Sequence, residues 1–187
     1  MKKFELTNEF ITNMFGTKLF RIRALVEFGD VEAGELGGYV EKESNLGHDD
    51  NAWVYDNAWV YGNARVYGDA QVFGDARVYD NALVYGNARV YGNAWVYGNA
   101  LVCSDEDYAY AHGFGSVNRT TTFFRLKDGG VGVRCGCFYG TLAQFRDKIR
   151  ETHGETKKAQ EYLMLADLME LRFEEDENEV GNRKYVE

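Results

Sequence analysis

The chain has 187 residues, a formal net charge of −9 and 45% hydrophobic residues. This length suffices for one or two small domains with cores of their own. An acidic chain repels a phosphate backbone, and no Lys/Arg-rich run offsets the charge, so we expect no binding to extended nucleic acid.

Targeting features favour the cytoplasm. No apolar stretch approaches the roughly 20 residues of a membrane span, so no membrane partner is expected. The N-terminal stretch MKKFELTNEFITNMFG is interrupted by Glu5, Asn8 and Glu9, which argues against a secretory signal. Three cysteines, an odd number, fit a reducing cytoplasm better than a disulfide framework.

Residues 1–50 are predicted to form a cap and an irregular first coil. An amphipathic segment at roughly residues 7–16 is expected to cover the open end of the repeat that follows. The stretch LFRIRALVEF is predicted as a strand. Val40 and Leu46 lie six residues apart, whereas Leu46 and Val54 lie eight apart, which predicts a bulge at GHDD.

Residues 51–103 repeat a six-residue unit, as in VYGNARVYGDAQVFGDA, through nine hexads without a slip. Even spacing suits strands, in which alternate residues face in and out, and Gly-Asn, Gly-Asp and Asp-Asn pairs favour turns. We therefore predict a mainly β fold built on a parallel β-helix, with three hexads and hence 18 residues per coil. Valine fills the centre of each face, and alanine fills each corner. The valines are 54, 60, 66, 72, 78, 84, 90, 96 and 102, and the alanines are 52, 58, 64, 70, 76, 82, 88, 94 and 100.

A branched aliphatic residue is followed four residues later by a small one, as in Val54 and Ala58 or Val60 and Ala64. This spacing resembles the hexapeptide-repeat left-handed β-helix superfamily. The resemblance implies left-handed coils and frequent trimers. It also implies two kinds of activity, which are acyl transfer with a histidine base and carbonic anhydrase activity with three histidines on zinc.

Aromatic and arginine side chains are expected to line up on the outside of the coils, because residues one coil apart stack at about 4.8 Å. Three interpretations stay open. The columns stabilise the solenoid by stacking and cation–π contacts, bury against sister subunits in a homo-oligomer such as a trimer, or form a platform for bases or sugars. The stacking or interface residues are Trp53, Trp59, Tyr61, Arg77, Tyr79, Trp95 and Tyr97.

Residues 104–175 are predicted to form a small α+β (ββαα) module. A β-hairpin is predicted from TTTFFRL and VGVRCGCF, which flank the turn KDGG. The first helix is predicted to have Thr141 as its N-cap and to end at Gly154. A second helix is predicted over residues 156–173, followed by a solvated acidic tail over 176–187. Together with the solenoid, the pattern FGS…RTTTFFR…DGG…CGCF…GTL…HG resembles uncharacterised proteins encoded by bacteriophages. This second resemblance implies a phage protein in the cytoplasm of an infected bacterium.

Histidines and cysteines are too few and too scattered for the catalytic sets of the superfamily. The repeat contains no histidine, and His48, His112 and His153 lie one in each segment, so we expect no enzyme, no metal and no cofactor. A single histidine acting as the base of an acyltransferase stays open. Cys135 and Cys137 are either small buried side chains or, with His153, a less favoured metal site or nucleophile–base pair.

The stretch HGFGSVNRTTT holds the densest group of ligand-binding residue types. Glycine and serine N–H groups can converge on an anion, an arginine can bind phosphate through two hydrogen bonds, and threonines supply hydroxyls. No Gly-Lys-Ser/Thr sequence follows, so it is not a P-loop. The alternative is a flexible connector before a threonine-rich edge strand. The predicted ligand-binding residues are His112, Gly113, Gly115, Ser116, Arg119, Thr120, Thr121 and Arg125.

The sequence therefore predicts a non-enzymatic, oligomeric phage protein that binds and sequesters a small phosphorylated ligand, such as a cyclic nucleotide signal of host defence. An alternative is a trimeric or polymer-forming scaffold whose C-terminal module docks a protein partner. An acyltransferase of the hexapeptide-repeat superfamily is the least favoured hypothesis.

Overall fold

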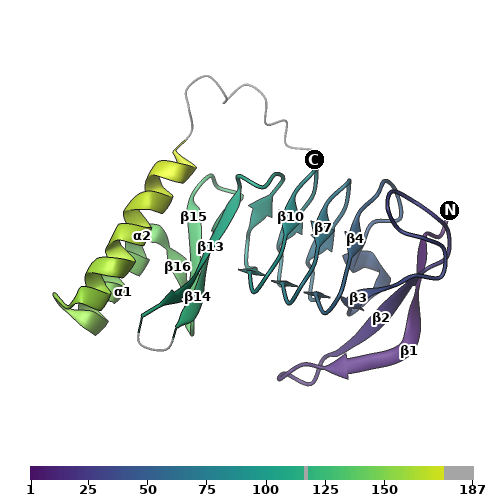
Figure 1. Cartoon of the computed structure of the whole chain (residues 1–187), viewed down its shortest axis with the longest axis horizontal. Coiled ribbons are helices and arrows are strands. Elements are labelled where there is room, and N and C mark those ends of the chain that lie inside the picture. Colours follow the sequence, from purple (N-terminus) through teal and green to yellow (C-terminus); the bar gives the residue numbers. More distant parts are fainter. Residues whose placement is uncertain (116–117, 175–187) are drawn as a thin grey trace.

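The computed structural model describes residues 1–115 and 118–174, which form a row of three parts (Figure 1). A hairpin unit lies at one end, a solenoid of stacked coils in the middle, and a sheet with two helices at the other end. No helix in this described portion is long and apolar enough to cross a membrane. The tail predicted at 176–187 lies outside the described residues.

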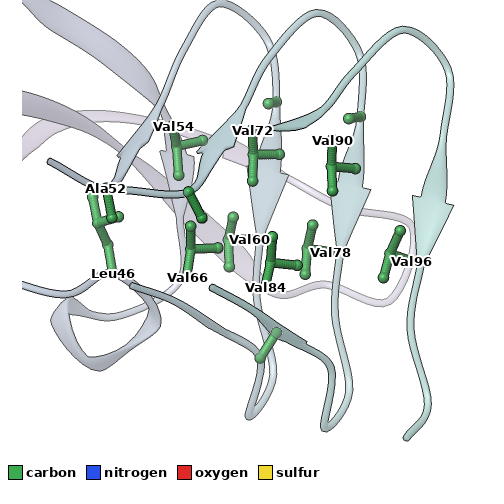
Figure 2. Close-up of a cluster of buried hydrophobic side chains, with 14 of the residues drawn as sticks. Leu46, Ala52, Val54, Val60, Val66, Val72, Val78, Val84, Val90 and Val96 are labelled. Atoms are coloured by element: carbon green, nitrogen blue, oxygen red, sulfur yellow. The ribbon is translucent and has the colours of Figure 1, made fainter. Parts of the chain in front are cut away.

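Nine two-residue strands build the solenoid, pair in parallel with one another and lie in three sheets. Each strand pairs with the strand one coil further on, as Val54 pairs with Val72 and Val60 with Val78. All repeat valines and alanines are fully buried, and Figure 2 shows the valines aligned in rows inside the coils. The predicted parallel β-helix with 18-residue coils is therefore confirmed. The strands are β4 (Trp53–Val54), β5 (Trp59–Val60), β6 (Arg65–Val66), β7 (Gln71–Val72), β8 (Arg77–Val78), β9 (Leu83–Val84), β10 (Arg89–Val90), β11 (Trp95–Val96) and β12 (Leu101–Val102).

Glycine occupies coil corners where both conformation and space require it. Gly68 has a φ of +69°, in the left-handed region that other residues rarely adopt. A Cβ atom on Gly68 would also lie 3.0 Å from the backbone nitrogen of Gly86, one coil further on. At this corner the two coils can therefore stack so closely only without a side chain, whereas Asp56 and Asp80 adopt the left-handed conformation at equivalent corners.

Four antiparallel strands form the C-terminal sheet, in the order β13 (Tyr108–Phe114), β14 (Arg119–Arg125), β15 (Val131–Cys135) and β16 (Phe138–Thr141). The predicted hairpin corresponds to β14 and β15 and is confirmed. The ββαα prediction was incomplete, because β13 and β16 extend this hairpin by one strand on each side.

Two helices follow the sheet, α1 (Leu142–His153) and α2 (Lys157–Phe173). The Thr141 side chain accepts a hydrogen bond from the N–H of Gln144, and Gly154 ends α1, so both predicted helix boundaries are confirmed. Thr156 caps α2 in the same way, through the N–H of Ala159.

The two faces of the C-terminal sheet belong to different cores. Tyr108 and Phe124 pack into the core of the solenoid, whereas Phe123 and Val133 pack beneath the helices. This division follows from strand alternation, which sends neighbouring residues to opposite faces. The sheet thus closes one end of the solenoid and supports α1 and α2 on its other side (Figure 1).

At the opposite end, β1 (Phe4–Thr12), β2 (Lys18–Ala24) and β3 (Leu36–Val40) form an antiparallel unit. β3 continues in parallel with β5, where Val40 pairs with Val60, and Leu46 bridges to Val66. Val40 and Leu46 therefore lie in register with the repeat valines, whereas β2 belongs to the antiparallel unit. The longer step from Leu46 to Val54 is absorbed in the loop between them, as expected from GHDD.

The end of the solenoid is covered by Phe4, Ile22 and Val31, which are buried in its core. The segment at 7–16 was expected to supply this cover, and that prediction was wrong. It forms the outer part of the β1–β2 hairpin, where Met14 and Phe15 are 85% and 78% exposed. The hairpin extends the sheet sideways, so its tip passes beyond the core (Figure 1).

The N-terminal unit is fastened to the first coil by Lys3 and His48. Lys3 Nζ donates hydrogen bonds to the backbone oxygens of Asp50 and Ala52, at 3.2 and 2.8 Å. The backbone N–H of Lys3 donates to Nδ1 of His48 at 3.2 Å, and the His48 ring stacks on Phe4. Burial lowers the pKa of His48 below its ordinary value, because desolvation disfavours the charged imidazolium.

We expect acid to weaken this end of the fold through His48. Its folded-state pKa lies below the unfolded value near 6.5, so its contribution to stability is present above that pH and is lost as pH falls below it. Urea unfolding between pH 8 and pH 5 should show the free energy of unfolding falling more steeply in the wild type than in His48→Phe, which keeps the stacking but cannot titrate. Parallel curves for the two proteins would contradict this role.

Candidate functional site

Tryptophan and arginine side chains alternate along one face of the solenoid and into the C-terminal sheet. The Arg77 guanidinium lies 4.0 Å from the ring centre of Trp59 and 4.6 Å from that of Trp95. Arg134, from β15, lies 4.1 Å from the ring centre of Trp95. Each contact is a cation–π interaction, worth about 0.5–1 kcal/mol at exposed sites. We call the column of Trp59, Arg77, Trp95 and Arg134 the Trp–Arg ladder.

A tyrosine column runs beside the Trp–Arg ladder. Tyr61, Tyr79 and Tyr97 stack with ring centres 4.9 and 4.6 Å apart, and Tyr139 of β16 lies 4.5 Å from Tyr97. Burial raises the pKa of the three solenoid hydroxyls, because the neighbouring rings displace water. The outward rings therefore stack on one another within one chain. Burial against sister subunits stays a prediction.

Trp53 does not belong to an outward column, contrary to expectation. Its side chain is fully buried, and the rings of Phe4 and Phe28 contact it edge-on at 6.2 and 5.3 Å. The reason is its place in the first regular coil, which the N-terminal unit covers. Trp53 is consequently part of the core and is not available to a partner or ligand.

The Trp–Arg ladder ends at a cleft of about 370 Å³ between the solenoid and the C-terminal sheet. Two of its lining residues come from the solenoid, and the others come from β13, β14, β15 and the turn after β15. We call it the junction cleft. It is lined by Asn93, Trp95, His112, Arg119, Thr120, Thr122, Arg134 and Gly136.

Hydrogen bonds and close packing position the polar side chains of the junction cleft. A ring nitrogen of His112 lies 2.9 Å from Oγ1 of Thr120. Arg119 lies against the turn that joins β15 to β16, where a Cβ atom on Gly136 would collide with the guanidinium. Gly136 also has a φ of +60°, so the turn and the position of Arg119 both require glycine.

The junction cleft is cationic within an acidic protein. None of its lining residues carries a carboxylate. Across residues 1–115 and 118–174, neither Arg119 nor Arg134 forms an ion pair with Asp or Glu. Elsewhere, ion pairs hold Arg21, Arg23, Arg89, Arg125, Arg146 and Arg150. Neither guanidinium group of the cleft is therefore neutralised by a carboxylate of the described residues, and that of Arg134 also hydrogen-bonds to Tyr79.

The structure brings together some of the residues predicted to bind a ligand. His112, Arg119 and Thr120 line the junction cleft beside Trp95 of the same chain. Gly113 and Gly115 have φ values of +92° and +75°, but neither lines the cleft. Ser116 lies outside the described residues.

Thr121 and Arg125 lie on the face of β14 opposite to Thr120 and Thr122, and neither lines the junction cleft, so the prediction that they share one site with Thr120 was wrong. Arg119 shares their face by alternation, but at the start of β14 it reaches the junction cleft as well. Thr121 donates a hydrogen bond to Sγ of Cys135 at 3.2 Å. Arg125 is buried in an ion pair with Asp107 at 3.2 Å and also donates to a backbone oxygen. Strand alternation sends these two side chains toward the helices, where Arg125 has a structural role.

Sequence reasoning missed Asn93, Arg134 and Gly136 as lining residues. A signal for Arg134 exists, because the KDGG turn fixes the register of β14 and β15 and places Arg134 opposite Thr122. The role of Gly136 depends on the position of a distant arginine, which no local pattern reveals.

Cys135, Cys137 and His153 line a second cavity, of about 250 Å³, which we call the helix-side cavity. It also contains Arg119, Lys148 and Tyr162, and it lies between the C-terminal sheet and the helices. Within the described ranges, no three or more His, Cys, Asp or Glu side chains are grouped as metal ligands.

Comparison with known protein families gives a match within the solenoid. Residues 58–74, 70–86, 76–90 and 82–98 match the family model described as the YdcK beta solenoid repeat. The chain is a β-helix repeat protein. The match covers coils that carry most of the Trp–Arg ladder, and it does not extend to the C-terminal sheet. No curated protein matches the chain.

We expect Arg77→Met to lower the free energy of unfolding by about 1–2 kcal/mol, because two cation–π contacts lose their cation while the aliphatic stem is kept. Arg89→Met is the matched control. Arg89 also precedes a repeat valine but is exposed in a surface ion pair with Asp105, so its replacement should cost about 0.5 kcal/mol or less. Equal losses in urea unfolding would contradict a special role for the ladder.

Proposed function

We propose that this protein binds and sequesters a small phosphorylated ligand, such as a nucleotide, in the junction cleft. The observation that carries the proposal is the pair of guanidinium groups of Arg119 and Arg134, which line one cleft and are free of carboxylate partners among the described residues. Arginine binds phosphate through two parallel hydrogen bonds, and these charge-assisted bonds are the strong ones.

Other groups in the junction cleft suit the same ligand. Thr120 and His112 supply a hydroxyl and a ring nitrogen that can bond to phosphate or ribose oxygens. Guanidinium groups from Arg77 and Arg134 already contact the Trp95 ring. A base would therefore stack on the Arg134 guanidinium and continue the alternation of ring and cation, rather than stack on Trp95.

The size and surroundings of the cleft also support a small ligand. Its volume of about 370 Å³ falls in the lower part of the range of small-molecule sites, roughly 300–1,000 Å³. The net charge of −9 opposes a long polyanion, whereas a small anion can lie within the local positive potential of the cleft.

The biological setting of the proposal rests on the resemblance of the C-terminal module to phage-encoded proteins. In that setting, an oligomeric and non-enzymatic protein would hold a nucleotide signal of host defence and lower its free concentration in the infected bacterium. Binding without conversion is sufficient for this role.

Calorimetry with AMP and cyclic AMP tests the binding. Arg119→Met and Arg134→Met should each weaken affinity about 10- to 100-fold, which corresponds to the loss of charge-assisted hydrogen bonds. Arg150→Met is the control, because Arg150 lies on α1 and lines neither cavity. Affinity should also fall as salt rises. If nucleotides at millimolar concentration give neither heat nor a thermal shift, the proposal fails.

A second candidate function is the scaffold, and the outer face of α2 favours it. Met164, Leu168 and Leu171 are 71%, 54% and 67% exposed. Their spacing places them on one stripe of the helix. Exposed apolar stripes mark interaction sites, so α2 is a candidate docking surface, with a second copy of this chain as the first partner to test.

Light scattering after size-exclusion chromatography checks this second candidate. If α2 joins copies, the wild-type mass should be a multiple of the monomer, or show no single value for an open polymer, and Leu168→Glu should shift it toward the monomer. Lys158→Glu is the control, because Lys158 is exposed in the first turn of α2. A wild-type monomer at all concentrations would contradict self-association.

A further inference from the structure

The junction cleft and the helix-side cavity meet at the edge of the C-terminal sheet. Arg119 lines both of them. It begins β14 and lies against Gly136, which lines the junction cleft, while Cys135 and Cys137 on either side of Gly136 line the helix-side cavity. A single guanidinium group is therefore shared by two cavities on opposite sides of one turn.

The helix-side cavity has the same sign of charge as the junction cleft. Its polar lining includes Lys148 and His153 besides Arg119, and no carboxylate lines it. Lys148 is paired with Glu151 at 2.8 Å, but both side chains are more than half exposed. Such exposed pairs contribute little, so the Lys148 ammonium can exchange this partner for an anion.

The helix-side cavity also provides an apolar wall. Phe138, Phe145 and Ile149 line it, and the Tyr162 ring lies 5.8 Å from that of Phe145. The two cavities thus repeat one combination, in which cationic groups lie beside a surface for a planar ring. In the junction cleft, the Arg134 guanidinium, which packs against Trp95, supplies that surface.

We infer that the ligand is a dinucleotide with two phosphate groups, one held in the junction cleft and the other in the helix-side cavity, with Arg119 between them. This inference rests on the proposed function and specifies its ligand. A mononucleotide can place its single phosphate and base in one cavity only. A dinucleotide can use both cavities, and the shared guanidinium fixes the distance between its phosphates.

Calorimetry with the linear dinucleotide pApA and with AMP tests the inference. We expect pApA to bind at least about tenfold more tightly than AMP. Lys148→Gln should weaken pApA about tenfold and leave AMP unchanged, whereas Arg119→Met should weaken both. Gly136→Ala should also weaken both, because the added Cβ displaces Arg119. Lys157→Gln is the control, since Lys157 is exposed and lines neither cavity.

The outcomes separate the inference from the proposed function. If AMP binds with the Arg119 dependence described above, but pApA binds no more tightly and Lys148→Gln changes neither, the dinucleotide inference is overturned and the proposed function stands. If neither compound binds, both are overturned. Circular dichroism and thermal melting of each variant verify that a loss of binding reflects the side chain and not unfolding.

Discussion

The fold depends on one constraint, the vertical register of parallel hydrogen bonds between coils. The N–H of Tyr61 bonds to the oxygen of Val78 at 3.0 Å, and that of Tyr79 to Val96 at 3.1 Å. Because every residue lies above its equivalent one coil away, a repeat in sequence becomes a column in space. Valine columns make the core, and aromatic columns make the outer ladders. The same register presents Trp95 and Tyr97 at the end of the solenoid, where the C-terminal sheet continues both ladders with Arg134 and Tyr139.

The solenoid was predictable from the sequence because each repeat residue pairs with its equivalent 18 residues further along the chain. The same holds for the β14–β15 hairpin and the cap at Thr141, which rest on local patterns. The burial of Trp53 was not predictable, since it depends on Phe4 and Phe28 from a unit without a repeat. Alternation also placed Thr121 and Arg125 on one face of β14, but it did not indicate which face meets the helices.

The candidate site arises where the solenoid joins the C-terminal sheet. Neither the solenoid nor the sheet forms the junction cleft alone, since Trp95 comes from one and Arg119 and Arg134 from the other. Arg134 is the last cation of the Trp–Arg ladder. Its contact with Trp95 holds the guanidinium at the junction cleft without a carboxylate partner among the described residues. In the proposed function, Arg134 therefore both stabilises the Trp–Arg ladder and binds the ligand. An acidic chain can in this way keep a cationic surface, because the aromatic rings replace the counter-ions.

The most direct test of this account is a crystal structure of the protein grown with AMP. The account predicts the phosphate within hydrogen-bond distance, about 2.7–3.2 Å, of the Arg119 guanidinium and the base stacked on Arg134. It would be contradicted by AMP bound away from the junction cleft. It would equally be contradicted by an Arg134 side chain that leaves Trp95 and pairs with a carboxylate, because the ladder would then not hold the binding group in place.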